Sequence, residues 1–458
     1  MLERLDERVL DGLFRERDVA EPHGQRGPDP RGLPPVCAFQ LTGVVHISSL
    51  AVATRGEPAR GRAMGENKTV TGSPAGPVLP PGEVRAAEAV LARAWGEPAV
   101  VQAAERIWGR SHVVRLRLDT GRAAVLKRRR DRPRGRSAQV FGVELATLQY
   151  LNAMPVPVAP RLLGADTDAG ILLLEDLGEG TSLADSLLAG ERSRVQADLI
   201  AYAQALGSLH AWSMGRAGGL AGLRVRHAPG EPAVTGWLDA IRRGTEPFLS
   251  AAAVLGVPVG GVADEIGELR VMLSEANYLG LVHGDACPDN VQIADGACRI
   301  FDFETSGWGP VAFDAAYLLA PFPSCWCFAS LPAEIAGPAI AAYRGRLEAG
   351  GIGLGPDWEE LTTAALAGLF IARGRMLAEA LDHDHEWGTT TIRPRFLAWL
   401  RSFTGRAGGA LPRLQHTASA MHERLAERWP GIRVPDYPPL AHHGSALARV
   451  PDGWEPRL

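Results

Sequence analysis

The residues from 281 to 319 include the side chains whose types and spacing best fit a chemical reaction. Asp285 follows a His-Gly pair, Asn290 stands five residues later, and Asp302 follows a short apolar run. Phosphoryl transfer needs little covalent help, but it needs magnesium held by oxygen ligands and a carboxylate near the attacking hydroxyl. The three side chains can supply those oxygens, so this stretch predicts a phosphoryl-transfer centre.

Short strands must position these three side chains. The sequence predicts a strand at 281–282, a second at 290–293 and a third at 298–301, with an Asp-Gly turn at 295–296 between the last two. Loops that leave such hairpin-related strands lie close together. We therefore expect the three oxygen-bearing side chains to project on one side.

The same stretch resembles a known family. HGDACPDN at 283–290 and IFDFE at 300–304 are similar to the catalytic loop and metal segment of the aminoglycoside phosphotransferase family, a branch of the protein-kinase-like fold. The resemblance implies that Asp285 is the catalytic base and that Asn290 and Asp302 bind Mg²⁺. It also implies a structural role for a later carboxylate, Asp314, and we expect His283 to brace the loop rather than act as a base.

Upstream positions extend the resemblance to an ATP site. Lys127 ends the run AAVLK, where the family has its phosphate-binding lysine, and Glu144 is placed to pair with it. A loop at 107–111, which includes Ser111, would cover the phosphates, and the segment LLLEDLG would meet the adenine. The predicted cofactor-binding residues are Lys127, Glu144, Ser111, Glu175 and Leu177. A solvated strand-end lysine remains the alternative for Lys127.

Hydrophobic periodicity predicts the surrounding elements. The expected elements are a helix at 82–95, a hairpin at 114–127, a helix at 140–151 and a strand at 171–174. After Gln196 the pattern is mostly helical, with further helical regions at about 358–380 and 393–403. The predicted fold class is α+β: a bilobal protein-kinase-like fold with a small N-terminal lobe containing an antiparallel sheet and a larger, mainly helical C-terminal lobe.

These elements suggest a domain plan. Residues 1–80 are rich in Gly, Pro and Arg and predict a disordered extension, and a product that starts at Met64 would lose no predicted domain. We expect a nucleotide-binding lobe at 81–174, a catalytic and substrate lobe at 175–440, and a tail at 441–458.

The composition of the chain limits the classes of binding partner that we expect. A net charge of −4 and a pI near 6.3 give no overall attraction for polyanions. Seven bases between Lys127 and Arg136 leave nucleic-acid binding as a minor alternative to a solvated loop. The chain has no long apolar run and no signal sequence, which predicts a cytoplasmic location without membrane contact. The five cysteines include no CxxC pair and are expected to be buried, reduced thiols.

Alternatives to small-molecule phosphorylation remain. A protein kinase is disfavoured because Gly284 replaces the usual Arg, Glu304 follows Phe303, and only twelve positions separate Asp302 from Asp314. A catalytically silent nucleotide-binding regulator of the same fold is the second hypothesis.

The acceptor is a hydroxyl-bearing small molecule of unknown identity, and the oligomeric state is open. The acidic run at 379–386 suits either a cationic amino-sugar or an exposed helix-ending loop. We expect its two histidines on opposite sides of the chain, which argues against a metal site.

Overall fold

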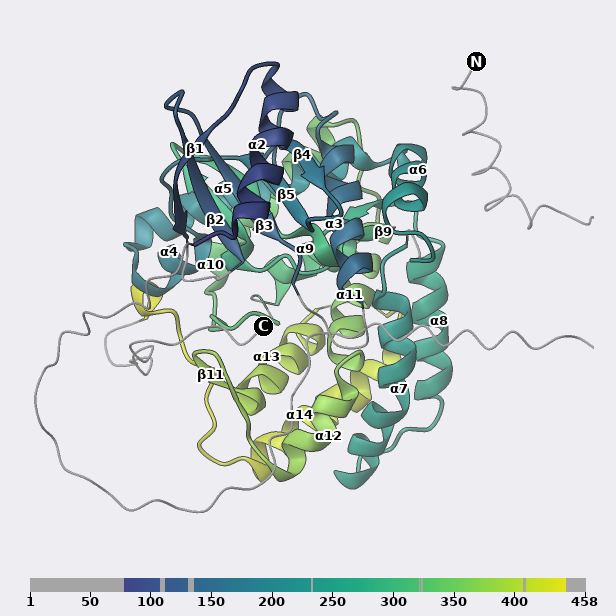
Figure 1. Ribbon diagram of the computed structural model, residues 1–458. Helices are drawn as coiled ribbons and strands as arrows, with labels where there is room; N and C mark the ends of the chain where they lie inside the picture. The colour runs from purple at the N-terminus through teal and green to yellow at the C-terminus, as the bar shows by residue number, and fades with distance from the viewer. Residues whose placement is uncertain are drawn as a thin grey trace, which may run out of the picture. The chain divides into compact units, whose positions relative to one another are not determined.

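The computed structural model describes residues 78–107, 112–130, 136–231, 234–320, 322, 324–406 and 409–441. The predictions for most of the extension before residue 81 and for nearly all of the tail after residue 440 lie outside these residues, as does Ser111. The described chain forms a small lobe built on one sheet, followed by a larger lobe of helices (Figure 1). This arrangement confirms the predicted fold class.

The small lobe contains two helices and a five-stranded antiparallel sheet. The sheet order is β1-β2-β3-β5-β4. The elements are α2 (Pro81–Trp95), β1 (Val101–Arg106), β2 (Val113–Leu118), β3 (Ala123–Arg128), α3 (Ser137–Leu151), β4 (Leu162–Asp166) and β5 (Ile171–Glu175).

Strand alternation divides the sheet between two apolar cores. On β3, Ala124 and Leu126 face the core that includes α2, whereas Val125 faces the core that includes α3. β5 alternates in the same way, with Ile171 and Leu173 on the α2 side. Successive side chains of a strand point to opposite faces. Lys127, next after Leu126, therefore points with Val125 toward α3.

The large lobe begins with helices and contains two short two-stranded sheets that carry the predicted site. Its first part comprises α4 (Leu183–Ala189), α5 (Arg192–Ser213), α6 (Ala217–His227), α7 (Trp237–Val254), α8 (Val262–Ser274), β6 (Leu279–Val282), the 3₁₀ turn η2 (Pro288–Asn290), β7 (Val291–Ala294), β8 (Ala297–Ile300), η3 (Phe303–Thr305), β9 (Gly307–Pro310) and α9 (Ala312–Leu319). β6 pairs with β9, and β7 pairs with β8.

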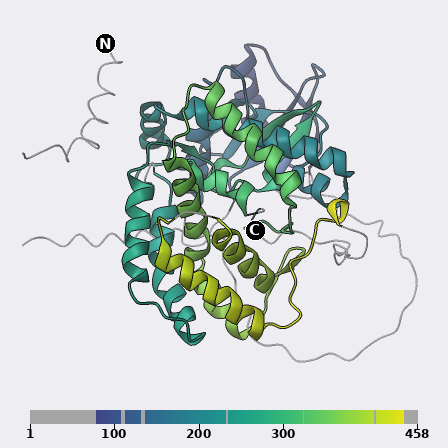
Figure 2. The same cartoon turned by 180° about the vertical axis from the view of Figure 1, so that it is seen from behind.

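The remainder of the large lobe is mainly helical. Its elements are α10 (Ala333–Ala349), α11 (Asp357–Ile371), α12 (Gly374–Asp382), β10 (Glu386–Trp387), β11 (Thr390–Thr391), α13 (Ile392–Thr404), α14 (Pro412–Arg428) and η4 (Pro438–Leu440). α13 packs along α14, as both views show (Figures 1 and 2). Within the described ranges, no single helix has the length and apolar character of a membrane span. Only α11 and α12 taken together pass that test, and they are bent by 48°.

A close helix crossing lies at the break between α11 and α12. A Cβ added to Gly244 of α7 would lie 2.0 Å from the carbonyl oxygen of Ile371, and one added to Gly374 would lie 2.3 Å from that of Gly244. Only glycine allows backbones to approach this closely. The crossing fixes the position of Arg373, which stands between the two helices.

Candidate active site

Three charged side chains from distant parts of the sequence meet at the boundary of the two lobes. Lys127 of β3 donates from Nζ to Glu144 Oε1 of α3 at 2.6 Å and to Asp302 Oδ1 at 2.5 Å. Burial lowers the pKa of Lys127, but the carboxylates of Asp302 and Glu144 outweigh burial and the net shift is upward. Lys127 is therefore a buried cation held between two acids, and not a solvated strand-end lysine.

Asp302 takes an unusual backbone conformation. It lies two residues after the end of β8 and has φ +71° and ψ 51°, the left-handed region that non-glycine residues seldom adopt. Outside glycine, only two other described residues, Asp295 and Phe322, have positive φ. This conformation turns the chain into η3 while Asp302 contacts Lys127. The local strain is offset by a buried, charge-assisted contact.

The loop before Asn290 is fixed by buried hydrogen bonds. Asp314, fully buried on α9, accepts from the backbone N–H of His283 at 2.6 Å and of Gly284 at 3.1 Å. Its Oδ2 also lies 3.2 Å from His210 Nε2. Asp314 thus has a structural role in this loop, and His210 is a packed core residue.

His283 braces the same loop from inside. Its Nε2 donates to the carbonyl oxygen of Phe301 at 3.0 Å, and its Nδ1 accepts from the N–H of Asp285 at 3.3 Å. Burial lowers the pKa of His283, which agrees with a neutral ring that donates from one nitrogen and accepts at the other. Since both nitrogens are engaged, His283 ties the loop to the segment that carries Asp302.

Gly284 permits a tight fit between these two segments. Its φ is +82°, and an added Cβ would lie 2.7 Å from the carbonyl oxygen of Thr305. The hydroxyl of Thr305 in turn donates to the carbonyl of His283 at 3.1 Å. An L side chain at residue 284 would be strained by the backbone and blocked by Thr305.

Asp285 is partly buried beside Asn290. The Asn290 side-chain amide donates to the backbone carbonyl of Asp285 at 2.9 Å and lies 3.4 Å from Oδ2 of its carboxylate. Burial raises the pKa of Asp285 to about 7, with the negative charges of Asp289 and Asp302 adding to the rise and Arg373 opposing it. A carboxyl with such a pKa suits proton transfer near neutrality.

A cleft lies beside Lys127, between the two lobes. Its walls come from both lobes and are mainly apolar, with charged side chains at the Lys127 triad and at the Arg115–Asp176 ion pair. The lining residues are Ile107, Val113, Arg115, Val125, Lys127, Glu144, Pro160, Leu174, Glu175, Asp176, Leu177, Gln292, Phe301 and Asp302. Every described residue predicted to bind the cofactor therefore lines one cleft.

The structure adds detail at the linker that follows β5. Glu175 donates its backbone N–H to the carbonyl of Arg161 at 2.9 Å, and its side chain accepts from the N–H of Arg161 at 3.1 Å. Gln292 donates to the carbonyls of Leu177 and Gly178 at 3.4 and 3.2 Å. The linker is thus held on both sides, and the N–H and carboxylate of Glu175 are already engaged.

A magnesium site would use few protein ligands. Among the described residues, no group of three or more His, Cys, Asp and Glu side chains is arranged to bind a metal. Mg²⁺ is commonly bound through one or two side-chain oxygens together with substrate phosphates. Asp302 beside the cleft and Asn290 next to Asp285 fit that pattern.

The cysteine prediction was wrong for one pair. Cys287 and Cys325 form a disulfide, whereas Cys298 and Cys327 are buried and free, as expected. The partners are separated by 38 positions, and only the tertiary fold brings them together. Cys37 lies outside the described residues.

Sequence reasoning also missed Arg373. Its guanidinium is buried between the rings of Trp237 and Trp399, at 5.4 Å from each centroid. It donates to the carbonyl oxygen of Leu369 at 2.7 Å and contributes a positive charge near Asp285. No local pattern marks this residue, because its position depends on the helix break.

Two further predictions concern the surface. The acidic run contributes to a helix end, since Asp384 accepts the N–H of Arg393 at 3.1 Å in the first turn of α13. The prediction for the two histidines was wrong: the rings of His383 and His385 stack with centroids 6.2 Å apart. They therefore lie on one side of the chain.

Arginines of the basic loop that the structure describes contact other parts of the same chain. Arg128 pairs with Glu83 at 2.6 Å, Arg129 donates to the carbonyl of Thr167 at 3.3 Å, and Arg136 pairs with Glu231 at 2.8 Å. These contacts give the arginines roles within the protein.

Comparison with known proteins identifies the family. Residues 103–361 match the phosphotransferase enzyme family, also called APH. The matched region spans more than half of the chain and includes β2, β3, α3, the segments 283–290 and 300–304 and every residue that lines the cleft. The protein belongs to this family of phosphotransferases, as the motifs at 283–290 and 300–304 predicted.

The chain is also similar to solved structures, at low identity. A macrolide 2′-phosphotransferase from Brachybacterium faecium is 16% identical, with 70% of this chain and 100% of that chain covered and a TM-score of 0.39. An aminoglycoside phosphotransferase from Alicyclobacillus acidocaldarius is 16% identical (78% and 97% covered; TM-score 0.39). A choline kinase from Streptococcus pneumoniae is 12% identical (67% and 94%; 0.39). No curated protein matches the chain significantly.

Proposed function

We propose that the protein is an ATP- and Mg²⁺-dependent phosphotransferase that moves the γ-phosphate of ATP to a hydroxyl of a small molecule. The observation that carries this proposal is the contact of Lys127 with both Glu144 and Asp302 at the inner end of an apolar cleft. A buried cation held by two acids beside a cleft between the lobes is what positioning of phosphates requires.

The geometry of the site supports a proposed role for each residue. Glu144 orients the ammonium of Lys127 toward the phosphates, and the apolar walls receive the adenine. Asp302 and Asn290 would hold Mg²⁺, which neutralises charge on the phosphates when bound. Asp285 accepts the proton of the acceptor hydroxyl as its oxygen attacks the γ-phosphorus and ADP leaves.

The chain between the metal segment and α9 supports a small acceptor. After Asp302 it forms η3, then β9, and α9 begins at Ala312. Each of these elements is short, and β9 is paired with β6. No segment remains there to form the docking loop that a protein substrate needs. The open acceptor classes are aminoglycosides, other hydroxylated antibiotics and hydroxylated metabolites.

The proposal includes a cytoplasmic location, because the donor is ATP. Nucleic acid and membranes are not among the proposed partners, since the described arginines of the basic loop contact the protein itself. Fractionation of the native cell, followed by detection of the protein with an antibody, would test the location directly.

The decisive experiment measures ADP release in the presence of a panel of hydroxylated acceptors, with and without Mg²⁺. We expect acceptor-dependent release that Asp285→Asn slows by about 10²-fold or more, while the affinity for ATP is little changed. Asp302→Asn should abolish the response to Mg²⁺.

Asp295→Asn is the matched control. Asp295 is exposed at the turn between β7 and β8 and has φ 50°, which Asn tolerates well. Its activity should equal that of the wild type. Binding of ATP with equal, acceptor-independent ADP release in the wild type and Asp285→Asn would favour the silent regulator instead.

A further inference from the structure

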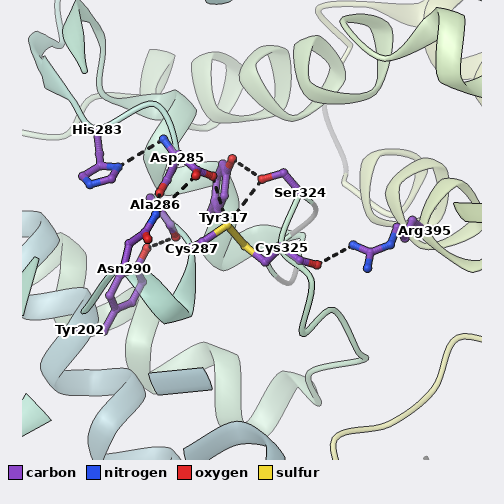
Figure 3. The surroundings of a disulfide bond; sticks show 10 residues. All are labelled: Tyr202, His283, Asp285, Ala286, Cys287, Asn290, Tyr317, Ser324, Cys325 and Arg395. Atoms are coloured by element: carbon purple, nitrogen blue, oxygen red, sulfur yellow. Dashed lines mark hydrogen bonds between the residues drawn. A yellow bond between two sulfur atoms is a disulfide. The ribbon is translucent and has the colours of Figure 1, made fainter. Parts of the chain in front are cut away.

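The disulfide joins the catalytic loop to a separate segment. Cys287 lies between Asp285 and Asn290, and its Sγ is 3.2 Å from Oδ1 of Asp285. Its partner, Cys325, belongs to the irregular stretch that connects α9 to α10. Figure 3 shows the S–S bond directly beside the Asp285 carboxylate. The disulfide therefore holds Cys325 next to Asp285, the proposed base.

Residues 324–326, called here the wall segment, are also anchored on their far side. Arg395 of α13 donates to the carbonyl oxygen of Cys325 at 2.7 Å (Figure 3). The same guanidinium donates to the carbonyl oxygen of Trp387 at 2.7 Å and lies over that ring. The wall segment is thus held by α13 on one side and by the disulfide on the other.

Ser324 adds a polar contact between the wall segment and the catalytic loop. Its Oγ lies 2.7 Å from the hydroxyl of Tyr317 and 3.8 Å from Sγ of Cys287. The positive charge of Arg373 acts on both Tyr317 and Asp285. Hydroxyl, phenol and guanidinium groups therefore gather at the Asp285 carboxylate.

This cluster lies apart from the nucleotide cleft. None of Cys287, Ser324, Cys325 and Tyr317 is among the residues that line that cleft. Because the nucleotide occupies the Lys127 side, an acceptor hydroxyl has to reach Asp285 from another direction. The wall segment borders the carboxylate on such a side.

We propose that the wall segment forms part of the acceptor site and that the Cys287–Cys325 disulfide is a redox-controlled brace that positions it. The proposal rests on the function proposed above and specifies how its acceptor side is regulated. In the oxidised protein, the brace holds the wall segment against the catalytic loop. In the reduced protein, the segment is released.

A dithiol can reduce the Cys287–Cys325 disulfide by thiol–disulfide exchange. One of its thiolates attacks a sulfur of the disulfide and forms a mixed disulfide, which its second thiol resolves. The products are two protein thiols and the oxidised dithiol. Cys287 and Cys325 are only 5% and 2% exposed, so this exchange requires local opening of the wall segment.

Reduction also changes the surroundings of the base. A disulfide sulfur has no hydrogen to donate, but the thiol of Cys287, 3.2 Å from Oδ1 of Asp285, does. It would compete with the acceptor hydroxyl for that oxygen. Disulfides in the reducing cytoplasm are usually transient or regulatory, which agrees with a reversible brace in an enzyme that uses ATP.

The first test uses the full chain, oxidised in air or reduced with dithiothreitol, and needs no identified acceptor. Hydrogen exchange followed by mass spectrometry should show faster exchange after reduction in peptides that contain Cys287 or Cys325. Binding of a fluorescent ATP analogue should change by less than about twofold. Magnesium-dependent ATP hydrolysis should fall about fivefold, the effect of one modest hydrogen bond to the base.

Three variants make the test specific. Cys287→Ser/Cys325→Ser should behave like the reduced wild type under both conditions. Cys298→Ser removes a buried free thiol of β8 and should retain basal hydrolysis and the response to reduction. Cys327→Ser, two residues from Cys325, should also keep that response.

The outcomes separate the two proposals. Two alkylatable thiols at Cys287 and Cys325 in the air-oxidised protein would overturn the brace, as would identical exchange and hydrolysis in both redox states. If the ATP analogue does not bind in either state, the proposed phosphotransferase function fails first. Binding with hydrolysis that depends on Asp285 but ignores reduction rejects the brace alone.

Discussion

At the scale of single residues, the lysine between two acids sets the conditions for nucleotide binding. Lys127 is 9% exposed and Glu144 3% exposed, so neither charge is screened well by water. Removing one member leaves the others buried without full compensation. A substitution in this triad should therefore affect both the stability of the fold and the proposed binding of phosphates.

Lys127→Met should lower the free energy of unfolding by about 3 kcal/mol, because it leaves the carboxylates of Glu144 and Asp302 facing each other in a buried place. Urea unfolding followed by circular dichroism measures this change. The double variant Lys127→Met/Glu144→Leu should be more stable than Lys127→Met alone. Additive losses in the double variant would contradict the triad as described.

The raised pKa of Asp285 predicts how activity depends on pH. Its carboxylate is the form that accepts a proton, so turnover should rise as pH increases through about 7, the value set mainly by burial. Arg373→Met removes a positive charge that favours the carboxylate. The acidic limb of the pH–rate profile should then move to higher pH by about one unit.

Arg375→Met provides the control for this shift. Arg375 lies on α12, two residues after Arg373, but its side chain is 88% exposed and pairs with Glu379 at 3.6 Å. Its pH–rate profile should match that of the wild type. A shift of equal size in both variants would show that net charge, and not the position of Arg373, is responsible.

At the scale of elements, close contact between two loops determines whether the site can form. The catalytic loop and η3 meet at Gly284, where φ is positive and a Cβ has no room. The turn at Gly296 also has positive φ, but nothing lies within 4 Å of a Cβ added there. The two glycines separate the cost of backbone strain from the cost of a clash.

Gly296→Ala should lower stability by about 1 kcal/mol, the cost of a left-handed conformation, and should retain activity. Gly284→Ala carries the same cost plus the clash with Thr305, and it should lose activity because His283 and Asp285 are displaced. Thermal unfolding and ADP release measure the two effects. Equal activity in both variants would refute the importance of the contact.

Local patterns predicted most of these elements but not all. The hairpin of β2 and β3, the helices α2, α3 and α13 and the motif strands were predicted from periodicity and confirmed. β1 was missed because most of its side chains are exposed and its sequence, VQAAER, has no β-branched alternation. The disulfide and Arg373 were missed because long-range packing creates them. Roles of individual site residues remain predictions.

At the scale of the whole molecule, the family match begins at residue 103 and the helix α2 at Pro81. A chain that starts at Met64 keeps all of these elements. We expect it to unfold at the same urea concentration as the full chain and to bind ATP with equal affinity. A lower midpoint would mean that residues 1–63 stabilise the fold.

The alternation of side chains between the two faces of β3 limits how the length of this strand can change in evolution. Leu126 and Lys127 are neighbours that serve opposite faces of the sheet, so inserting or deleting one residue upstream in this strand would exchange them. An ammonium would enter the apolar layer under α2, and a leucine would meet the phosphates. Natural variants that change the length of β3 should therefore gain or lose residues two at a time, whereas the exposed turn at Gly121 tolerates single changes.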